Sequence, residues 1–360
     1  MSASDSIPFA SSAKTKSRHA AYDGPWKSRS EQPIRILAAV LAHSATISIM
    51  PGLRNEFALI EWIRQQTSGH PRLAVGIGDD AAVLRFPEPA QALVTVDMLM
   101  EGVDFLLDAA TPQQIGRKSL AVNLSDIAAM AGLPVAAVVA VSLPQRGGAE
   151  LAMGLQQGIQ QLAKEFNVAI AGGDTNTWNG PLVVSITVVG EAVSPGPVLR
   201  SGAQPGDWIC ATGSFGGSIS GKHLDFTPRI REAAALHQAV RLHAMIDVSD
   251  GLAADLGHIL DESHVGAILD AEKIPISQAA LETDDRRTPL EHALGDGEDF
   301  ELLFTVSPGD GQSLLDANPC GVAVTRIGEI VPGGGCQLRG RDGKLSSLAA
   351  LGWKHPFDQS

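Results

Sequence analysis

The chain has 360 residues, of which 44% are hydrophobic and 4% aromatic, and its formal net charge at neutral pH is −13. This length suits two domains of ordinary size, and this apolar fraction is sufficient for two cores. The negative charge argues against a nucleic-acid partner, because phosphate contacts need clustered Lys and Arg.

Residues 1–49 differ in composition from the rest. Up to Arg35 they are rich in Ser, Lys and Arg, and the apolar run 34–50 is interrupted by Arg35 and His43. A basic leader with few acidic residues can be a targeting peptide. The alternative, which we expect, is a disordered extension translated from a start upstream of a natural one at Met50. The apolar run is too short to cross a membrane, so no membrane partner is expected.

The pattern of residues 56–192 predicts helices and strands in one domain, which we place at 50–194. A helix begins at Thr111-Pro112 and continues through Met130, since proline at the first helical position loses no needed donor. The β-branched run 135–143 is typical of a buried strand. The other elements expected here are helices over 56–66 and 150–166 and strands over 93–97, 168–171 and 181–192.

The cluster Ser194-Pro195-Gly196-Pro197 breaks this pattern and predicts a domain boundary, with a C-terminal domain over 195–360. The expected elements that follow are strands over 207–212, 245–247, 299–306 and 322–330 and a helix over 252–261. Strands and long helices in both halves predict two α/β (α+β) domains. The three cysteines, Cys210, Cys320 and Cys336, form no CxxC pair, which predicts a reducing, cytoplasmic location without a zinc site or disulfide.

Seven aspartates lie in five short patches, each at the end of an apolar run or just inside one. The patches are Gly76-Ile77-Gly78-Asp79-Asp80-Ala81, Thr95-Val96-Asp97, Asn123-Leu124-Ser125-Asp126, Gly172-Gly173-Asp174 and Asp247-Val248-Ser249-Asp250-Gly251. A carboxylate carried away from water is costly unless it is paired or holds a metal. Basic residues are scarce nearby, with only Arg117 and Lys118 close to any patch. Oxygen ligands without cations indicate several Mg²⁺ ions and phosphoryl chemistry.

Two glycine-rich patterns predict other sites but fail on their details. Gly76-Ile77-Gly78 begins like a dinucleotide fingerprint, but the two aspartates that follow would repel a pyrophosphate. The segment 216–222 is close to a P-loop, but His223 stands where Ser or Thr would hold Mg²⁺. For any single aspartate the alternative is a helix cap, and Asp247, Ser249 and Asp250 fit that alternative best. The combination of patches and their order argue against it.

That combination resembles the thiamine-monophosphate kinase family, within the superfamily that includes aminoimidazole-ribonucleotide synthetase. The resemblance runs from Phe57 to Trp353. Besides the aspartate patches, it takes in Lys-Ser-Leu-Ala-Val-Asn-Leu-Ser-Asp at 118, Arg-Ser-Gly-Ala-Gln-Pro-Gly-Asp at 200, Ile-Asp-Val-Ser-Asp-Gly-Leu at 246 and Gly-Glu-Asp-Phe-Glu-Leu at 297.

The resemblance implies two α/β domains of this superfamily's type and a homodimer built on the N-terminal domain. It implies that the metals are surrounded by Asp80, Thr95, Val96 (through its backbone), Asp97, Asp126, Asp174, Asp247 and Asp250. The residues implied at ATP are Gly173, Arg200 and Ser249, and Glu298 and Trp353 are implied at the thiamine portion. Two positions depart from the family pattern: Val96 stands where some members have a hydroxyl residue, and Asp104 where a histidine is frequent near the substrate.

The implied reaction is ATP-dependent phosphorylation of thiamine phosphate to thiamine diphosphate by direct in-line transfer. The acceptor is a phosphate monoester whose second pKa is about 6, so it needs no general base at neutral pH. Catalysis would then rest on positioning and on neutralisation of charge by metals. The alternatives are another ATP-dependent synthetase of the superfamily and a non-catalytic protein that binds Mg²⁺ and nucleotide.

Overall fold

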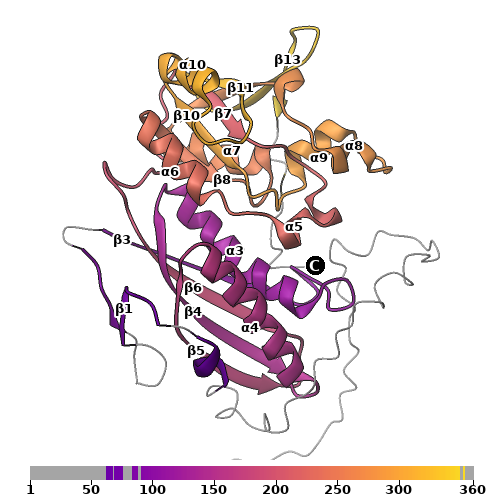
Figure 1. Cartoon of the computed structure of the whole chain (residues 1–360). Helices are drawn as coiled ribbons and strands as arrows, with labels where there is room; N and C mark the ends of the chain where they lie inside the picture. Colours follow the sequence, from indigo (N-terminus) through magenta and orange to yellow (C-terminus); the bar gives the residue numbers. More distant parts are fainter. Residues whose placement is uncertain (1–61, 68, 76–82, 88–90, 349–351, 353–360) are drawn as a thin grey trace, which may run out of the picture. The chain divides into compact units, whose positions relative to one another are not determined.

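The computed structural model describes residues 62–67, 69–75, 83–87, 91–348 and 352 (Figure 1). The leader, Asp79, Asp80 and Trp353 lie outside these residues, as does most of the helix expected over 56–66, of which 62–66 are helical. Two short strands, β1 (Leu73–Val75) and β2 (Val83–Leu84), form an antiparallel pair. Among the described residues no helix is both long and apolar enough to cross a membrane.

A four-stranded sheet with the order β3-β6-β4-β5 forms the first half of the described chain. Only β4 and β5 run parallel; the other neighbours are antiparallel. Helices α3 and α4 pack together along one face (Figure 1). The strands are β3 (Ala92–Met100), β4 (Leu133–Pro144), β5 (Ala169–Trp178) and β6 (Val183–Glu191), and the helices are α3 (Pro112–Ala129) and α4 (Gly148–Glu165).

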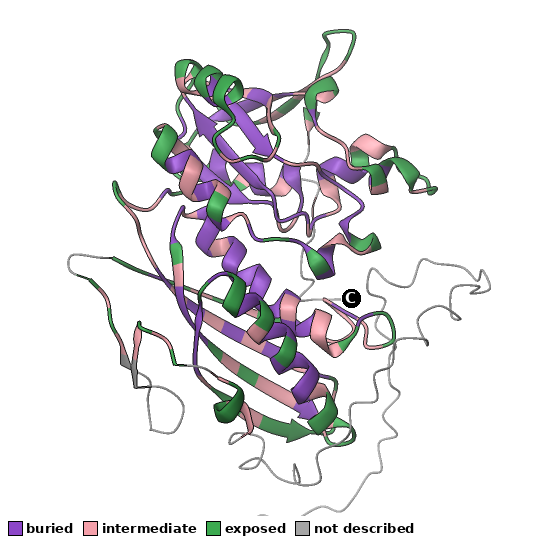
Figure 2. Cartoon of the chain, in the orientation of Figure 1, coloured by how far each residue is buried: buried purple, intermediate pink, exposed green. Residues whose placement is uncertain are grey.

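The other face of this sheet is partly covered at β4 and β5, where Leu73, Leu84 and Phe86 pack against buried residues, and it is open to solvent along β3 in the chain described. On β3, Leu93 and Leu99 are buried, whereas Val94, Val96 and Met98 are exposed by 69%, 61% and 59%. This alternation follows from the two-residue period of a strand covered on one side only (Figure 2). β3 is therefore an edge strand with an unusual apolar row on its uncovered side.

A seven-stranded sheet with the order β13-β12-β9-β11-β7-β10-β8 forms the second half. Its pairs are antiparallel except for β12 beside β9. The strands are β7 (Trp208–Thr212), β8 (Leu242–Asp247), β9 (Gly266–Asp270), β10 (Leu302–Val306), β11 (Val324–Val331), β12 (Gly335–Arg339) and β13 (Leu345–Leu348). The helices are α5 (Lys222–Asp225), α6 (Ile230–Ala239), α7 (Leu252–Ser263), α8 (Gln278–Glu282), α9 (Pro289–Gly295) and α10 (Pro308–Ala317).

Helix α3 joins the two sheets, because it contacts β3 and β6 as well as α5, α6 and β8. Its start is fixed by a capping box in which the Thr111 hydroxyl accepts from Gln114 N–H and the Gln114 side chain accepts from Thr111 N–H. Leu120 and Leu124 of α3 share one apolar cluster with Leu236 of α6 and Phe304 of β10. An almost fully buried helix can carry polar side chains to a site between two layers, and α3 does so with Lys118 and Asp126.

Mixed helix and sheet in both halves confirm the predicted α/β (α+β) class. Several predicted strands differ in extent, and for two of them the structure shows the physical reason. The one expected over 168–171 continues through Gly172-Gly173 to Trp178, because β4 runs alongside it, and a Cβ on Gly173 would lie 2.0 Å from the Val139 carbonyl oxygen. The one expected from Asp299 begins only at Leu302, since Phe300 has a φ of +50°.

Candidate functional site

Three of the predicted aspartates, Asp97, Asp126 and Asp247, come together from three elements. Asp97 lies in β3, Asp126 near the end of α3, and Asp247 at the last position of β8. The pKa of Asp97 is raised to about 7, first by burial and then by the charges of Asp126, Asp247 and Asp104. Burial, followed by the charge of Asp126, likewise raises the pKa of Asp247 to about 7. The three carboxylates thus repel one another in a partly desolvated site.

Hydroxyl groups from neighbouring positions hold two of these carboxylates. The Thr95 hydroxyl donates to Asp126, and the Ser125 hydroxyl donates to Asp247 Oδ2 at 2.5 Å. These bonds favour the charged forms, but burial still raises the pKa of Asp126. The cluster is therefore oriented by hydrogen bonds while its negative charge remains largely uncompensated.

A cavity of about 460 Å³ adjoins the cluster, a size within the range of small-molecule sites. Its lining includes Thr95, Asp126 and Asp247, together with Arg200 and the backbone around it. The Arg200 charge lowers the pKa of both Asp126 and Asp247, although less than burial raises it. One guanidinium thus faces several carboxylates, so the cavity can accept a cation beside the aspartates and an anion beside Arg200.

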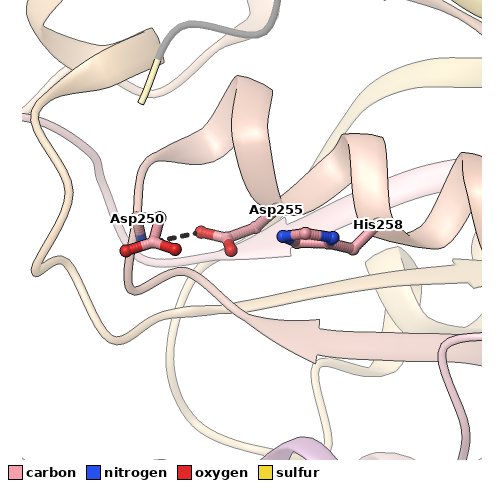
Figure 3. Close-up of side chains that lie close together, drawn as sticks. All are labelled: Asp250, Asp255 and His258. Atoms are coloured by element: carbon pink, nitrogen blue, oxygen red, sulfur yellow. Dashed lines mark hydrogen bonds between the residues drawn. The ribbon is translucent and has the colours of Figure 1, made fainter. Parts of the chain in front are cut away.

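The turn after β8 carries Ser249 and Asp250 and leads into α7 (Figure 3). The N–H groups of Asp250 and Gly251 donate to Asp255 Oδ2 at 3.0 and 3.1 Å, so Asp255 orders the start of α7. Burial, then the charges of Asp247 and Asp250, raises the pKa of Asp255 to about 8. Ligand atoms of Asp250, Asp255 and His258 lie within 4.8 Å of one another. Asp255 and His258 were not predicted; their signal is the i, i+3 spacing on a helix that follows the Ser-Asp-Gly turn.

Asp174 is not brought to this cluster within the chain described, whereas Gly173 lies in the same row as Asp97 but is separated from it by β4 and β6. Asp174 pairs across β4 and β6 with the row that contains Met98, whereas Asp97 lies in the row of Ile186. Ile186 is buried under the helices and Met98 is 59% exposed, so the two rows face opposite sides of the sheet. Asp174 is itself exposed, and its Oδ1 accepts from Thr175 N–H at 2.9 Å.

Asp104 and Glu298, two of the residues predicted at the substrate, lie in two loops. The Asp104 carboxylate accepts from Met100 N–H at 2.7 Å within the loop that follows β3. Glu298 lies in the left-handed region, with a φ of +56°, and its N–H donates to the Ser249 carbonyl at 2.6 Å. Gly352 lies against the Asp250 turn, since a Cβ there would be 2.8 Å from the Asp250 carbonyl oxygen. The Val96 side chain points to the uncovered face, which leaves only its backbone for a ligand.

Comparisons with known proteins agree on one family. Residues 78–192 match the family AIR synthase related protein, N-terminal domain, and residues 204–341 match the corresponding C-terminal domain. The thiamine-monophosphate kinase of Rhodopirellula baltica is 42% identical over 309 residues, 83% of this chain and 97% of that protein.

Solved structures give the same result. The crystal structure of thiamine-monophosphate kinase from Stenotrophomonas maltophilia K279a has a TM-score of 0.70 at 36% identity, and the match covers 81% of this chain and 98% of that one. AaThiL complexed with AMPPCP and TMP has a TM-score of 0.66 at 29% identity, and the match covers 83% of this chain and 96% of that one.

Proposed function

The chain belongs to the thiamine-monophosphate kinase family, and we propose that it transfers the terminal phosphoryl group of ATP to thiamine phosphate by direct in-line attack. The observation that carries this proposal is the convergence of Asp97, Asp126 and Asp247 beside a cavity that also contains Arg200. Such a site can gather the phosphates of two anionic substrates only if cations enter with them.

The cluster fits Mg²⁺ on chemical grounds. Its ligands are hard carboxylate oxygens, their pKa values are raised by burial and mutual repulsion, and a bound cation would relieve both costs. Asp97, Asp126 and Asp247 would hold metal, and Asp80, Thr95, the Val96 carbonyl and Asp250 are proposed as further ligands. Bound Mg²⁺ would neutralise the phosphate oxygens and the charge that develops during transfer.

The protein's own groups supply orientation and charge. Arg200 lines the cavity, and we assign it to ATP together with Ser249 and Gly173. Glu298 and Trp353 are assigned to the thiamine portion. No side chain has to remove a proton, because the acceptor phosphate is already ionised at neutral pH. The Asp104 carboxylate is bonded to the Met100 N–H, so it orders the substrate loop.

A homodimer would account for the position of Asp174. Because that carboxylate faces the uncovered side of the sheet, it can join a metal cluster only if a second copy approaches there. The exposed row of Val94, Val96 and Met98 on the same face supports such an interface, since large apolar rows seldom stay in water. The partner would then contribute Asp174 and Gly173 to the site of the first copy.

The experiment is an assay of purified protein with ATP, Mg²⁺ and thiamine phosphate, with products separated by chromatography. We expect equal amounts of ADP and thiamine diphosphate. ATP binding without ADP formation would instead support a non-catalytic nucleotide-binding protein, and ADP with a different phosphorylated product would support another synthetase of the superfamily. The cytoplasmic location stays a prediction from the cysteine content.

A further inference from the structure

Lys118 is a fully buried lysine on α3 whose contacts come from three separate segments. Its Nζ donates to Glu298 Oε1 at 2.8 Å and Oε2 at 2.6 Å, and to the Asp104 carbonyl oxygen at 2.8 Å. His223 Nδ1 lies 3.2 Å from Lys118 Nζ and 3.1 Å from Glu298 Oε2. Lysine is almost never fully buried unless it is paired, and here a single ammonium links both loops assigned to the substrate.

Lys118 and Glu298 form an ion pair, and of the two side chains only that of Glu298 is exposed and can contact a ligand. Burial raises the pKa of Glu298, but the His223 hydrogen bond and the Lys118 charge and hydrogen bonds outweigh it, so the net shift is downward. The Lys118 side chain is 0% exposed and that of Glu298 is 25% exposed. A carboxylate has about four lone-pair sites, so Glu298 can bind both Lys118 and a donor on a ligand.

The backbone around Glu298 is held separately from its side chain. Its left-handed φ of +56° is unfavourable for a residue with a Cβ. The main-chain bonds Glu298 N–H to Ser249 O, at 2.6 Å, and Phe300 N–H to Val248 O, at 2.8 Å, fix this geometry. Since the loop is anchored through its main chain, Lys118 acts mainly on the direction of the carboxylate.

We propose that Lys118 is a positioning residue for the acceptor substrate, which fixes the Glu298 carboxylate and the Asp104 loop where they receive the nitrogen-containing rings of thiamine phosphate. This inference rests on the proposed function. A buried ion pair adds little net stability compared with an apolar pair of equal volume, so its effect falls on orientation. A charged acceptor held in one orientation strengthens a hydrogen bond from an amino group or a cationic ring.

The test uses Lys118→Met, Glu298→Gln and the double variant, with thiamine phosphate binding measured by calorimetry in Mg²⁺ and KM measured for both substrates. We expect Lys118→Met to weaken thiamine phosphate binding by about 30-fold or more, as for a lost bond to a charged group. KM for ATP should change by less than about threefold. The double variant should bind thiamine phosphate within about threefold of Glu298→Gln, because Lys118 would act mainly through Glu298 and only weakly through the Asp104 loop.

Arg117→Met is the matched control, because it removes a cation from the next position of α3 and breaks only the 2.6 Å bond to the Phe226 carbonyl. Arg117→Met should change KM for ATP and KM for thiamine phosphate by the same factor. If Lys118→Met does not fold, the proposal is tested by comparing thiamine phosphate binding by the double variant with binding by Glu298→Gln. Equal effects of Lys118→Met on both substrates would overturn the proposal, as would a double variant much weaker than Glu298→Gln or one that cannot fold. Wild-type protein that turns over no thiamine phosphate would instead reject the proposed function.

Discussion

Asp126 shows how one carboxylate can lower the stability of the folded chain and still be required for its chemistry. It lies in a site with Asp97 and Asp247, and its charge raises the pKa of both of these carboxyl groups. Asp126→Asn should therefore raise Tm in EDTA by about 2–4 °C, because like charges in a partly buried site cost on the order of 1 kcal/mol or more. The side-chain oxygen of an asparagine at position 126 can still accept the hydrogen bond from the Thr95 hydroxyl.

The same variant should lower kcat by at least about 10²-fold, since it removes a charged ligand that acts on the transition state. Scanning calorimetry and steady-state kinetics measure the two effects. The control is Asp316→Asn on α10, where the exposed carboxylate only accepts from Gln312 at 2.9 Å; neither quantity should change. Near wild-type turnover in Asp126→Asn would reject the metal cluster.

The raised pKa values of Asp97 and Asp247, each about 7, set the pH dependence of stability without metal. A carboxyl group whose folded-state pKa lies above its unfolded value binds protons more tightly when folded. Stability in EDTA should therefore fall as the pH rises from about 4.5 to about 8, since Asp255, with a pKa of about 8, is the last of these raised groups to ionise. Denaturation between pH 4.5 and 8 measures the slope, and Asp97→Asn should flatten it. Excess Mg²⁺ should also flatten it, and a slope that Mg²⁺ leaves unchanged would contradict binding at these aspartates.

At the scale of elements, the contact between α3 and α4 fixes the position of the site. A Cβ added at Gly158 of α4 would lie 1.9 Å from the Gln113 carbonyl oxygen of α3. Gly158→Ala should destabilise the protein by about 1–3 kcal/mol, because the backbones cannot separate without disturbing the layer beneath. Gly257→Ala is the matched control, since a Cβ there meets nothing within 4 Å, and alanine should stabilise that helix slightly. Urea denaturation compares the two, and equal effects would refute the close-packing argument.

The elements that the sequence predicts well are those with a single strong signal. The start of α3 follows from Pro112 after Thr111, and strand β4 follows from the apolar run within 133–144. Both signals are local, and tertiary contacts do not change the elements that they predict. Helix α6 and strands β12 and β13 were not predicted; the two strands are short and carry few apolar residues, and β12 pairs with the distant β9 as well as with β13. The extension of β5 past Gly172 depends on β4 beside it, which no local pattern encodes.

The prediction of the site has the same limit, because features that depend on tertiary contacts cannot be inferred from a local pattern. An aspartate at the end of an apolar run indicates a carboxylate carried inward, which led to Asp97, Asp126 and Asp247. The face on which Asp174 lies depends on strand register and on an irregularity between Ala137 and Val138. The sequence identified Lys118 as a basic residue near an aspartate patch but not its burial, because a lysine on a helix normally faces solvent; only the fold shows that α3 passes between two layers.

At the scale of the whole molecule, the opposite facing of Asp97 and Asp174 leads to a complementation test. If Asp174 acts on the partner's site, Asp97→Asn and Asp174→Asn homodimers should each be inactive. Subunit exchange between them should restore about a quarter of wild-type activity, because half of the dimers are mixed and each has one intact site. Light scattering should show a dimer throughout. A mixture that stays inactive after proven exchange would place Asp174 at its own chain's site or at neither.

Two main-chain hydrogen bonds fix the distance between the turn at Ser249 and the loop at Glu298. They do not depend on side-chain identity, so they keep the turn at Ser249 and the loop at Glu298 a constant distance apart whatever residue stands at 298. On the proposed function, acceptor choice can then be redesigned at positions 118, 223 and 298 without moving the carboxylates proposed to hold the metal ions. New acceptors are limited by the span between their phosphate and their ring, and molecules longer than thiamine phosphate will require a change in the backbone.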